Sequence, residues 1–249
     1  ISSDKNVRLS KDKRNNLVFE FIRLVEVAKP KFFVMENVRG IKTRENGKIF
    51  NELLKNISDI GYFFKTNTLN SADYGVPQNR ERVFIIGSKK GMNFEFPKFT
   101  HGSELLGLKP YETVGSALKG LNKKGIENHV PLKHKEKNIE RYKLIPEGGR
   151  LPEEKLSKEL YRKNFGNTFK RLDRKKPSLT IVPGHNAFPI HPTLNRSLTV
   201  REAARLQTFD DSFIFVGPRH EQCIQVGNSV PPKLSYEFAK NIKRCLKKF

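Results

Sequence analysis

Apolar residues recur at helical spacing in three stretches of the chain. Residues 15–28 are typical of an amphipathic helix, and Lys29-Pro30 predicts its end because proline disfavours a helical conformation in the residue before it. Residues 47–60 repeat the pattern and are followed by Gly61, a common helix stop. A last helix is expected to begin near Pro231-Pro232. The apolar positions of the three helices are Leu17, Phe21, Leu24, Val25 and Ala28; Ile49, Leu53, Leu54, Ile57 and Ile60; and Leu234, Phe238, Ile242 and Leu246.

Short apolar runs lie between these helices. The run KFFVM at 31–35 predicts a buried strand that ends just before Glu36. Residues 62–69 and 82–87 predict two more strands around a polar loop. Strand, helix and strand in this order indicate an α/β unit.

The chain from about 88 to 195 has a different composition. Glycine, proline and lysine interrupt it and apolar periodicity fades, which predicts a loop-rich basic segment with at most a few short strands. Order returns at Ser197. Thr199 and Glu202 have the spacing of a capping box, which predicts a helix through about Thr208.

The charge balance is strongly basic. The chain of 249 residues has 48 Lys and Arg against 26 Asp and Glu, a net charge of +22 with a pI near 10.0. Such an excess attracts polyanions through counterion release, so nucleic acid is the first expected partner and an anionic membrane surface the second. A lysine-rich, merely solvated surface is the alternative that composition leaves open.

The two cysteines, Cys223 and Cys245, are too few for a disulfide framework and have no metal-ligand spacing, so no metal site is expected. A reducing, cytoplasmic setting associated with the nucleoid fits this composition best. No apolar run approaches the ~20 residues of a membrane span, so no membrane partner is expected. The first residues, ISSDKNVRLSKDKR, resemble no signal peptide and contain no initiator methionine, which points to a piece of something longer.

Four local patterns follow one another along the chain: ENV at 36–38, QNRER at 78–82, REAAR at 201–205 and GNSV at 227–230. They resemble the ENV, QxRxR, RExxR and GNxV motifs of the DNA cytosine-5 methyltransferases. Each pattern alone is weak, but their joint order, with a basic variable stretch between the second and the third, is specific. The resemblance covers nearly the whole chain.

The resemblance implies a chemistry for three of these residues. In the family a cysteine thiolate adds to carbon 6 of a flipped-out cytosine, and carbon 5 then takes a methyl group from S-adenosylmethionine. Glu36 matches the glutamate that protonates N3, a role that a raised pKa would serve. Arg82 matches the residue that contacts the cytosine O2, and Arg80 is expected to support the same site. Without the motif context, an alternating Arg-Glu-Arg run indicates a surface ion-pair ladder.

Other positions match the family's binding residues. Asn228 and Ser229 match contacts with the amino-acid end of the cofactor, Gly227 allows close backbone approach, and Phe209 falls where an aromatic residue lies beside the cofactor. The expected DNA contacts are Thr180, Gly184 and Arg82, with lysines and arginines of 119–176 on phosphates. His185 and His191 approach DNA or, as the favoured reading, satisfy loop carbonyls. Arg201, Glu202 and Arg205 are expected to be structural, and Cys223 and Cys245 to be buried filler.

Two essential family motifs are absent. The sequence has neither an FxGxG-like turn for the cofactor nor a Pro-Cys pair, and residues 1–14 resemble the mobile loop that follows Pro-Cys. The resemblance therefore implies an incomplete Rossmann-like α/β methyltransferase domain with an inserted target-recognition domain. The expected division is 1–87 (catalytic), 88–212 (recognition) and 213–249 (return to the catalytic domain). A second polypeptide, or a longer parent chain, would carry the missing motifs and cover an exposed sheet edge.

Three functions compete at this point. The first is methyl transfer to cytosine in double-stranded DNA, inactive in this chain alone. The second is a non-catalytic DNA-binding subunit or degenerate enzyme, and the third is a basic RNA-binding α/β protein. The motif set disfavours the third, and the intact Glu36 and Arg82 favour the first over the second.

Overall fold

The computed structural model describes residues 17–89, 94–121, 125–152, 154, 156–161, 169–184 and 187–247. The expected loop at 1–14 lies outside these residues. The chain divides into two compact units: unit 1 comprises Ile1–Leu69, Glu81–Pro97 and Phe238–Phe249, and unit 2 comprises Asn70–Arg80 and Lys98–Glu237. Because the short segment Asn70–Arg80 belongs to unit 2, the chain passes between the units four times. The expected catalytic and recognition boundaries remain a prediction, since compactness does not assign a role to either unit.

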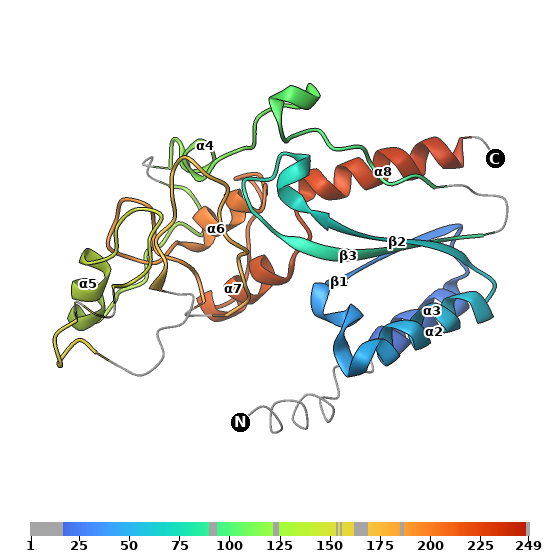
Figure 1. Cartoon of the computed structure of the whole chain (residues 1–249), viewed down its shortest axis with the longest axis horizontal. Coiled ribbons are helices and arrows are strands. Elements are labelled where there is room, and N and C mark those ends of the chain that lie inside the picture. Colours follow the sequence, from blue (N-terminus) through green and yellow to red (C-terminus); the bar gives the residue numbers. More distant parts are fainter. Residues whose placement is uncertain are drawn as a thin grey trace. The chain divides into compact units, whose positions relative to one another are not determined.

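The centre of unit 1 is a three-stranded sheet in the order β1-β3-β2, formed by β1 (Phe32–Val38), β2 (Phe63–Asn70) and β3 (Glu81–Ser88) (Figure 1). β1 and β3 are antiparallel, and their register runs from Phe32↔Ser88 to Val38↔Arg82. This pairing extends β1 three residues beyond the apolar run KFFVM. The prediction that Glu36 follows the strand is therefore wrong: Glu36 lies inside β1, because a partner strand distant in sequence continues the ladder.

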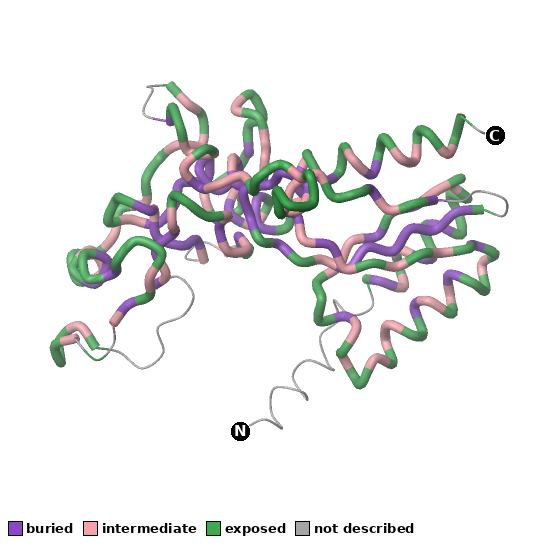
Figure 2. Tube along the Cα trace, turned by 45° about the horizontal axis from the view of Figure 1, so that its top comes forward, coloured by how far each residue is buried: buried purple, intermediate pink, exposed green. Residues whose placement is uncertain are grey.

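Helices cover both faces of this sheet. α2 (Leu17–Ala28) and α3 (Lys48–Asp59) pack on the face that carries Val83 and Ile85 of β3. Phe84 points to the opposite face because strand side chains alternate, and its ring meets Phe238 of α8 (Pro232–Leu246) at 4.7 Å between centroids. β3 is consequently buried on both faces, and Figure 2 shows a long run of buried residues in the sheet.

α2 forms where the apolar spacing predicts it, but it buries a different stripe. Val18, Ile22 and Val25 face the sheet, whereas the expected Leu17, Leu24 and Ala28 are exposed. The helix is apolar almost all round, so helical spacing alone does not decide which stripe packs. The predicted apolar face was therefore wrong except for Val25 and the half-buried Phe21.

Unit 2 has little regular structure, as the composition of 88–195 predicts. Its helices are α4 (Val114–Leu118), α5 (Glu136–Lys143), α6 (Val200–Leu206) and α7 (Arg219–Asn228), joined by loops with isolated bridges. The capping box of Thr199 and Glu202 at the start of α6 is confirmed. Its main core surrounds α6 and includes Leu198, Leu206, Ile181, Phe188 and Cys223.

Short 3-10 turns connect these elements: η2 (Arg39–Lys42), η3 (Arg44–Gly47), η4 (Ser71–Tyr74) and η5 (Glu104–Leu106). In the part of the chain that the structure describes, no helix is both long enough and apolar enough to cross a bilayer.

Candidate functional site

Unit 1 brings Glu36 and Arg82 together. Glu36 pairs in register with Phe84, so Arg82, two residues earlier on β3, projects from the same face as its diagonal neighbour. Arg82 Nε lies 3.1 Å from Glu36 Oε1, and the two side chains are 13% and 20% exposed. Two of the three residues expected to act on the base are thus held side by side on neighbouring strands.

Burial and charge act in opposite directions on Arg82. Burial lowers the pKa of Arg82, while the charge and hydrogen bond of Glu36 raise it. Arg82 Nη1 also donates to the backbone oxygen of Glu81 at 2.8 Å, which fixes the guanidinium plane. A neighbouring guanidinium favours an ionised carboxylate. An acid role for Glu36 therefore requires that a bound base share or replace this ion pair.

Arg80 belongs to unit 2 and has different partners. Its side chain is buried, with Nη1 donating to Ile181 O at 3.2 Å and Nη2 to Gly227 O at 3.1 Å. Its backbone nitrogen donates to Asn70 Oδ1 at 2.9 Å. These contacts tie Arg80 to the loop around Ile181, to the C-terminal end of α7 and to Asn70, so the structure gives Arg80 a bracing position. The expected catalytic support from Arg80 remains a prediction.

Sequence reasoning assigned no role to Gln78, the first residue of the QNRER pattern. Gln78 is fully buried; its Oε1 accepts from Ile181 N at 2.9 Å and its Nε2 donates to Leu206 O at 3.3 Å. It therefore ties the 78–82 segment to α6. Its membership of a motif was the available signal, but its partners are more than 100 residues away in the chain.

The residues expected to hold the cofactor's amino-acid end lie at the C-terminus of α7. Asn228 is exposed, and the Ser229 hydroxyl donates to Val226 O at 2.8 Å, which leaves its oxygen able to accept. An exposed amide and a hydroxyl oxygen fit an amino acid's carboxylate and ammonium groups. A Cβ on Gly227 would lie 2.3 Å from Pro183 N, so the close approach at this glycine is made by the chain's own loop.

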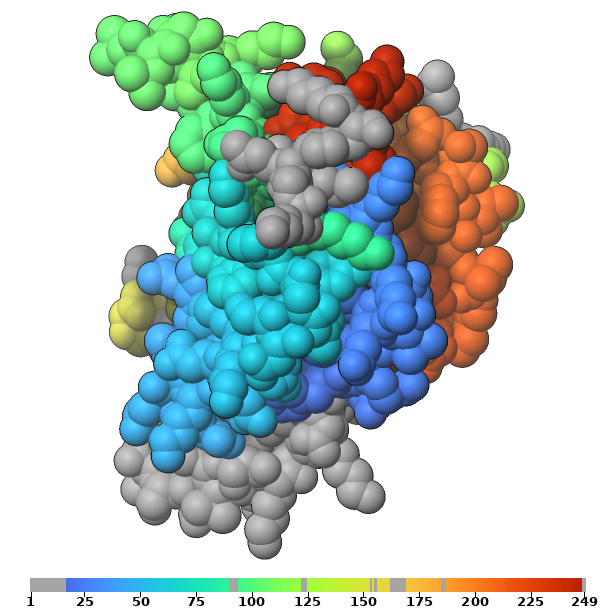
Figure 3. Space-filling view, turned by 90° about the vertical axis from the view of Figure 1, so that its right-hand side faces the viewer, coloured from blue at the N-terminus to red at the C-terminus, as the bar shows by residue number. Residues whose placement is uncertain are grey.

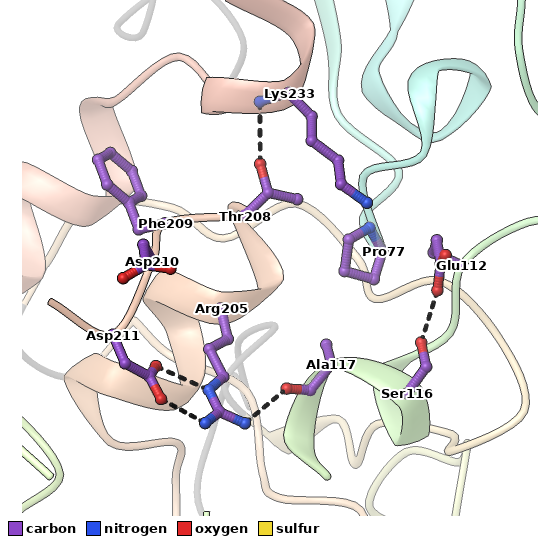
Figure 4. A pocket seen from close by; sticks show the side chains of 10 residues that line it. All are labelled: Pro77, Glu112, Ser116, Ala117, Arg205, Thr208, Phe209, Asp210, Asp211 and Lys233. Carbon is purple, nitrogen blue, oxygen red and sulfur yellow. Dashed lines mark hydrogen bonds and ion pairs between the residues drawn. The ribbon is translucent and has the colours of Figure 1, made fainter. Parts of the chain in front are cut away.

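Phe209 lines a pocket whose wall does not include these two residues. Its ring packs on Phe213 and Phe215, with centroids 5.0 and 5.1 Å away, and it lines an open pocket of about 470 Å³ in unit 2 (Figure 4). Polar groups on the pocket wall already have internal partners, such as Arg205 with Asp211. The wall residues are Pro77, Glu112, Ser116, Ala117, Arg205, Thr208, Phe209, Asp210, Asp211 and Lys233, without Asn228 or Ser229. The expected contact of Phe209 with the cofactor therefore stays a prediction, and Asn228 and Ser229 do not share the pocket that Phe209 lines.

Thr180 and Gly184, two of the expected DNA contacts, belong to the loop that packs on residues 78–80. The Thr180 hydroxyl donates to Asn79 O at 2.7 Å, and Gly184 adopts φ +139°, a conformation that favours glycine. His185 lies outside the described residues. His191 Nδ1 accepts from the backbone nitrogens of Thr193 and Leu194, and burial lowers the pKa of His191 to about 4. His191 therefore bonds within its own loop, but to backbone nitrogens and not to the carbonyls that were expected as its partners.

α6 holds unit 2 together through its charged residues, as expected. Glu202 accepts two 2.7 Å hydrogen bonds from Arg196, and Arg201 donates to the backbone oxygens of Asp210 and Phe213. Arg205 Nη1 donates to Lys119 O at 2.7 Å. Cys223 is fully buried, and burial raises the pKa of its thiol, which suits core packing and not nucleophilic attack. Cys245 is half-buried.

Comparison with known proteins gives a consistent result. The family model described as C-5 cytosine-specific DNA methylase matches residues 2–244. The type II methyltransferase M.NgoFVII of Neisseria gonorrhoeae is 39% identical over 92% of this chain and 63% of its own length. M1.HphI of Haemophilus parahaemolyticus is 37% identical over 93% of this chain and 61% of its own length. The chain thus spans less than two thirds of these relatives.

Solved structures show a similar fold. A protein described as a DNA modification methyltransferase encoded within a prophage (E. coli) superposes with a TM-score of 0.65 and 27% identity, over 95% of this chain and 75% of that one. The methyltransferase EhMeth of Entamoeba histolytica superposes with a TM-score of 0.52 and 17% identity, over 98% and 72%. The expected α/β methyltransferase fold is therefore confirmed.

Proposed function

Because the chain belongs to the C-5 cytosine-specific DNA methylase family, we propose that it methylates carbon 5 of cytosine in double-stranded DNA. S-adenosylmethionine supplies the methyl group when bound. The observation that carries this proposal is the pairing of Glu36 with Arg82 on β1 and β3. A carboxyl group and a guanidinium placed side by side match N3 and O2 of a cytosine, which are neighbouring atoms on one edge of the base. A DNA substrate also implies that the enzyme acts at the nucleoid, in the cytoplasm.

Glu36 and Arg82 would act after the cytosine has left the helix, since its ring atoms are inaccessible in the stack. Arg82 donates to O2 and orients the ring, and the Glu36 carboxyl shares its proton with N3 as a thiolate adds to carbon 6. The proton at N3 neutralises charge that would otherwise build up on the ring. Loss of the carbon 5 proton after methyl transfer allows the thiolate to leave and restores the base.

Asn228 and Ser229 would bind the amino-acid end of S-adenosylmethionine through the exposed amide and the hydroxyl oxygen. The rest of that pocket, together with the thiolate, belongs in this proposal to a part of the enzyme supplied by a second polypeptide or a longer chain. The sheet supports this. β1 ends the strand order within the described residues, and Val34 and Val38 on it are 36% and 54% exposed. An apolar edge strand left open invites pairing.

The neighbouring helix carries a second exposed apolar stripe. Leu17 and Leu24 of α2 are 62% and 56% exposed although the opposite stripe of the helix is buried. Since soluble proteins rarely leave contiguous apolar surface open, this stripe and the β1 edge are where the complementary part would dock. Native mass spectrometry of the protein from its source tests this: a longer parent or a co-purifying chain is expected, and a lone 28.7 kDa species would contradict it.

The catalytic assignment is tested by Glu36→Gln. In the complete enzyme, methyl transfer should fall by about 10²- to 10⁴-fold, because an amide cannot donate a proton to N3, while DNA affinity stays within error. Glu52→Gln, on the exposed side of α3, is the matched control and should keep full turnover. Unchanged turnover in Glu36→Gln would overturn the role. A complete enzyme that binds DNA but never methylates it would favour the non-catalytic recognition subunit.

A further inference from the structure

A basic loop follows β1, the strand that carries Glu36, in unit 1. We use this name for residues 39–48, which contain Arg39, Lys42, Arg44 and Lys48 against the single acid Glu45, a net charge of 4 − 1 = +3. The loop comprises η2, η3 and the first residue of α3. Arg39, Glu45 and Lys48 are exposed, and Lys42 and Arg44 are half-buried. The light-blue segment that contains the loop lies at the surface in Figure 3.

The backbone of the basic loop is anchored. Ile41 is 5% exposed and belongs to the core beneath the sheet. Thr43 donates to Gly40 O through both its backbone nitrogen and its hydroxyl. Lys42 Nζ donates to Thr68 Oγ1 at 2.9 Å and lies 5.9 Å from the centre of the Phe50 ring. The loop therefore presents its remaining side chains from a fixed position.

Three consecutive residues of the loop are left-handed. Glu45 has φ 49° and ψ 45°, Asn46 has φ 55° and ψ 32°, and Gly47 has φ 84°. A non-glycine residue in this region is unfavourable, and two in succession are seldom retained without a use. Observed strain of this kind is a reason to look for function.

The charged ends of the loop and of β3 meet beside the base-binding pair. Arg39 Nη1 lies 2.9 Å from Glu81 Oε2, and these side chains are 73% and 53% exposed. Such a surface ion pair contributes little net stability, so another anion can replace Glu81 easily. Because three residues span at most about 11 Å, Arg39 starts within that distance of Glu36.

From this placement we propose that the basic loop binds backbone phosphates next to the target cytosine, with Arg39 moving from Glu81 to a phosphate oxygen. The planar guanidinium matches phosphate geometry with two parallel hydrogen bonds. Such contacts would set the position of the DNA strand without reading its sequence. The inference rests on the proposed function, and it adds a phosphate site to the base-binding pair.

The test compares the two partners of one ion pair. Affinity of the whole chain for a fluorescein-labelled duplex is measured by anisotropy across a salt series for wild type, Arg39→Ala and Glu81→Gln. Loss of one phosphate contact should weaken Arg39→Ala about 8-fold near 0.1 M salt and reduce the log–log salt slope by about 0.9. Glu81→Gln should bind at least as tightly as wild type, because a competitor for Arg39 is removed.

Arg23→Ala is the matched control, since Arg23 forms an equally exposed ion pair with Glu20 on α2 at 2.8 Å. It should leave affinity and slope nearly unchanged. Equal losses of DNA affinity in Arg39→Ala and Glu81→Gln would show that the ion pair only supports the fold. Equal losses in Arg39→Ala and Arg23→Ala would show only an effect of general charge. Either result overturns the inference. Both can occur while Glu36→Gln still lowers methyl transfer as predicted, so the two proposals fail separately. A wild-type chain with no DNA affinity would contradict both.

Discussion

Gly227 lies in α7, where the backbone of a neighbouring loop contacts it. The structure therefore predicts whether its replacement by alanine stabilises or destabilises the protein. A Cβ there would lie 2.3 Å from Pro183 N, 2.4 Å from Pro183 Cα and 2.6 Å from Val182 C. These are backbone atoms that no rotamer change can move. Forced overpacking of this kind costs about 3 kcal/mol, at the upper end of the usual range. Alanine in a helix gains about 1 kcal/mol over glycine.

The difference is a net loss of about 2 kcal/mol, which for a chain of this size lowers the melting temperature by about 4–8 °C. The melting of Gly227→Ala would be followed by circular dichroism. Hydrogen exchange should show lost protection at the Ile181 amide, which donates to Gln78, because Arg80 bonds both Ile181 O and Gly227 O. Gly40→Ala is the control, since nothing lies within 4 Å of a Cβ at Gly40. A Gly227→Ala protein as stable as wild type would refute the packing argument.

Two further predictions concern buried groups of unit 2. Burial tends to raise the pKa of Glu202, but the hydrogen bonds and charge of Arg196 outweigh it and hold that pKa below its usual value. A carboxyl group whose pKa is lower in the folded than in the unfolded protein adds stability above the unfolded pKa, and this stability is lost as the pH falls through the folded pKa. At pH values below about 4.3, the melting temperature of the wild type should therefore fall, and that of Glu202→Gln should fall less. Parallel curves of melting temperature against pH would contradict this. A thiol reagent at mildly alkaline pH should modify Cys245 in the folded protein and Cys223 only in denaturant, because Cys223 is fully buried; rapid modification of both would show that this core opens.

Local patterns predicted local structure well. The stop at Lys29-Pro30, the capping box of Thr199 and Glu202, and the start of α8 at Pro232 all depend on neighbours in sequence, and all are observed. α7 escaped prediction because its sequence RHEQCIQVGN has almost no apolar periodicity. Its position depends on tertiary contacts of Cys223 and Val226 with the core around α6.

The features that could not be predicted from the sequence depend on contacts between residues far apart in the chain. Glu36 falls inside β1 because β3, more than 40 residues later, extends the ladder to Val38. Arg80 and Arg82 are two positions apart in one motif, yet one bonds carbonyls of unit 2 and the other bonds Glu36 in unit 1. The motif predicted that both arginines matter, and only the structure separates their surroundings.

The segment Asn70–Arg80 limits how the rest of unit 2 can be exchanged between members of the family. Although Lys98–Glu237 is continuous, its core is completed by the buried Gln78 and Arg80, which come from before β3. A transplanted region that did not present backbone acceptors where Leu206, Ile181 and Gly227 now stand would leave these groups unsatisfied, at about 1–3 kcal/mol for each. Recombination within the family should therefore preserve this short segment's hydrogen-bond partners even where all the surrounding loops diverge.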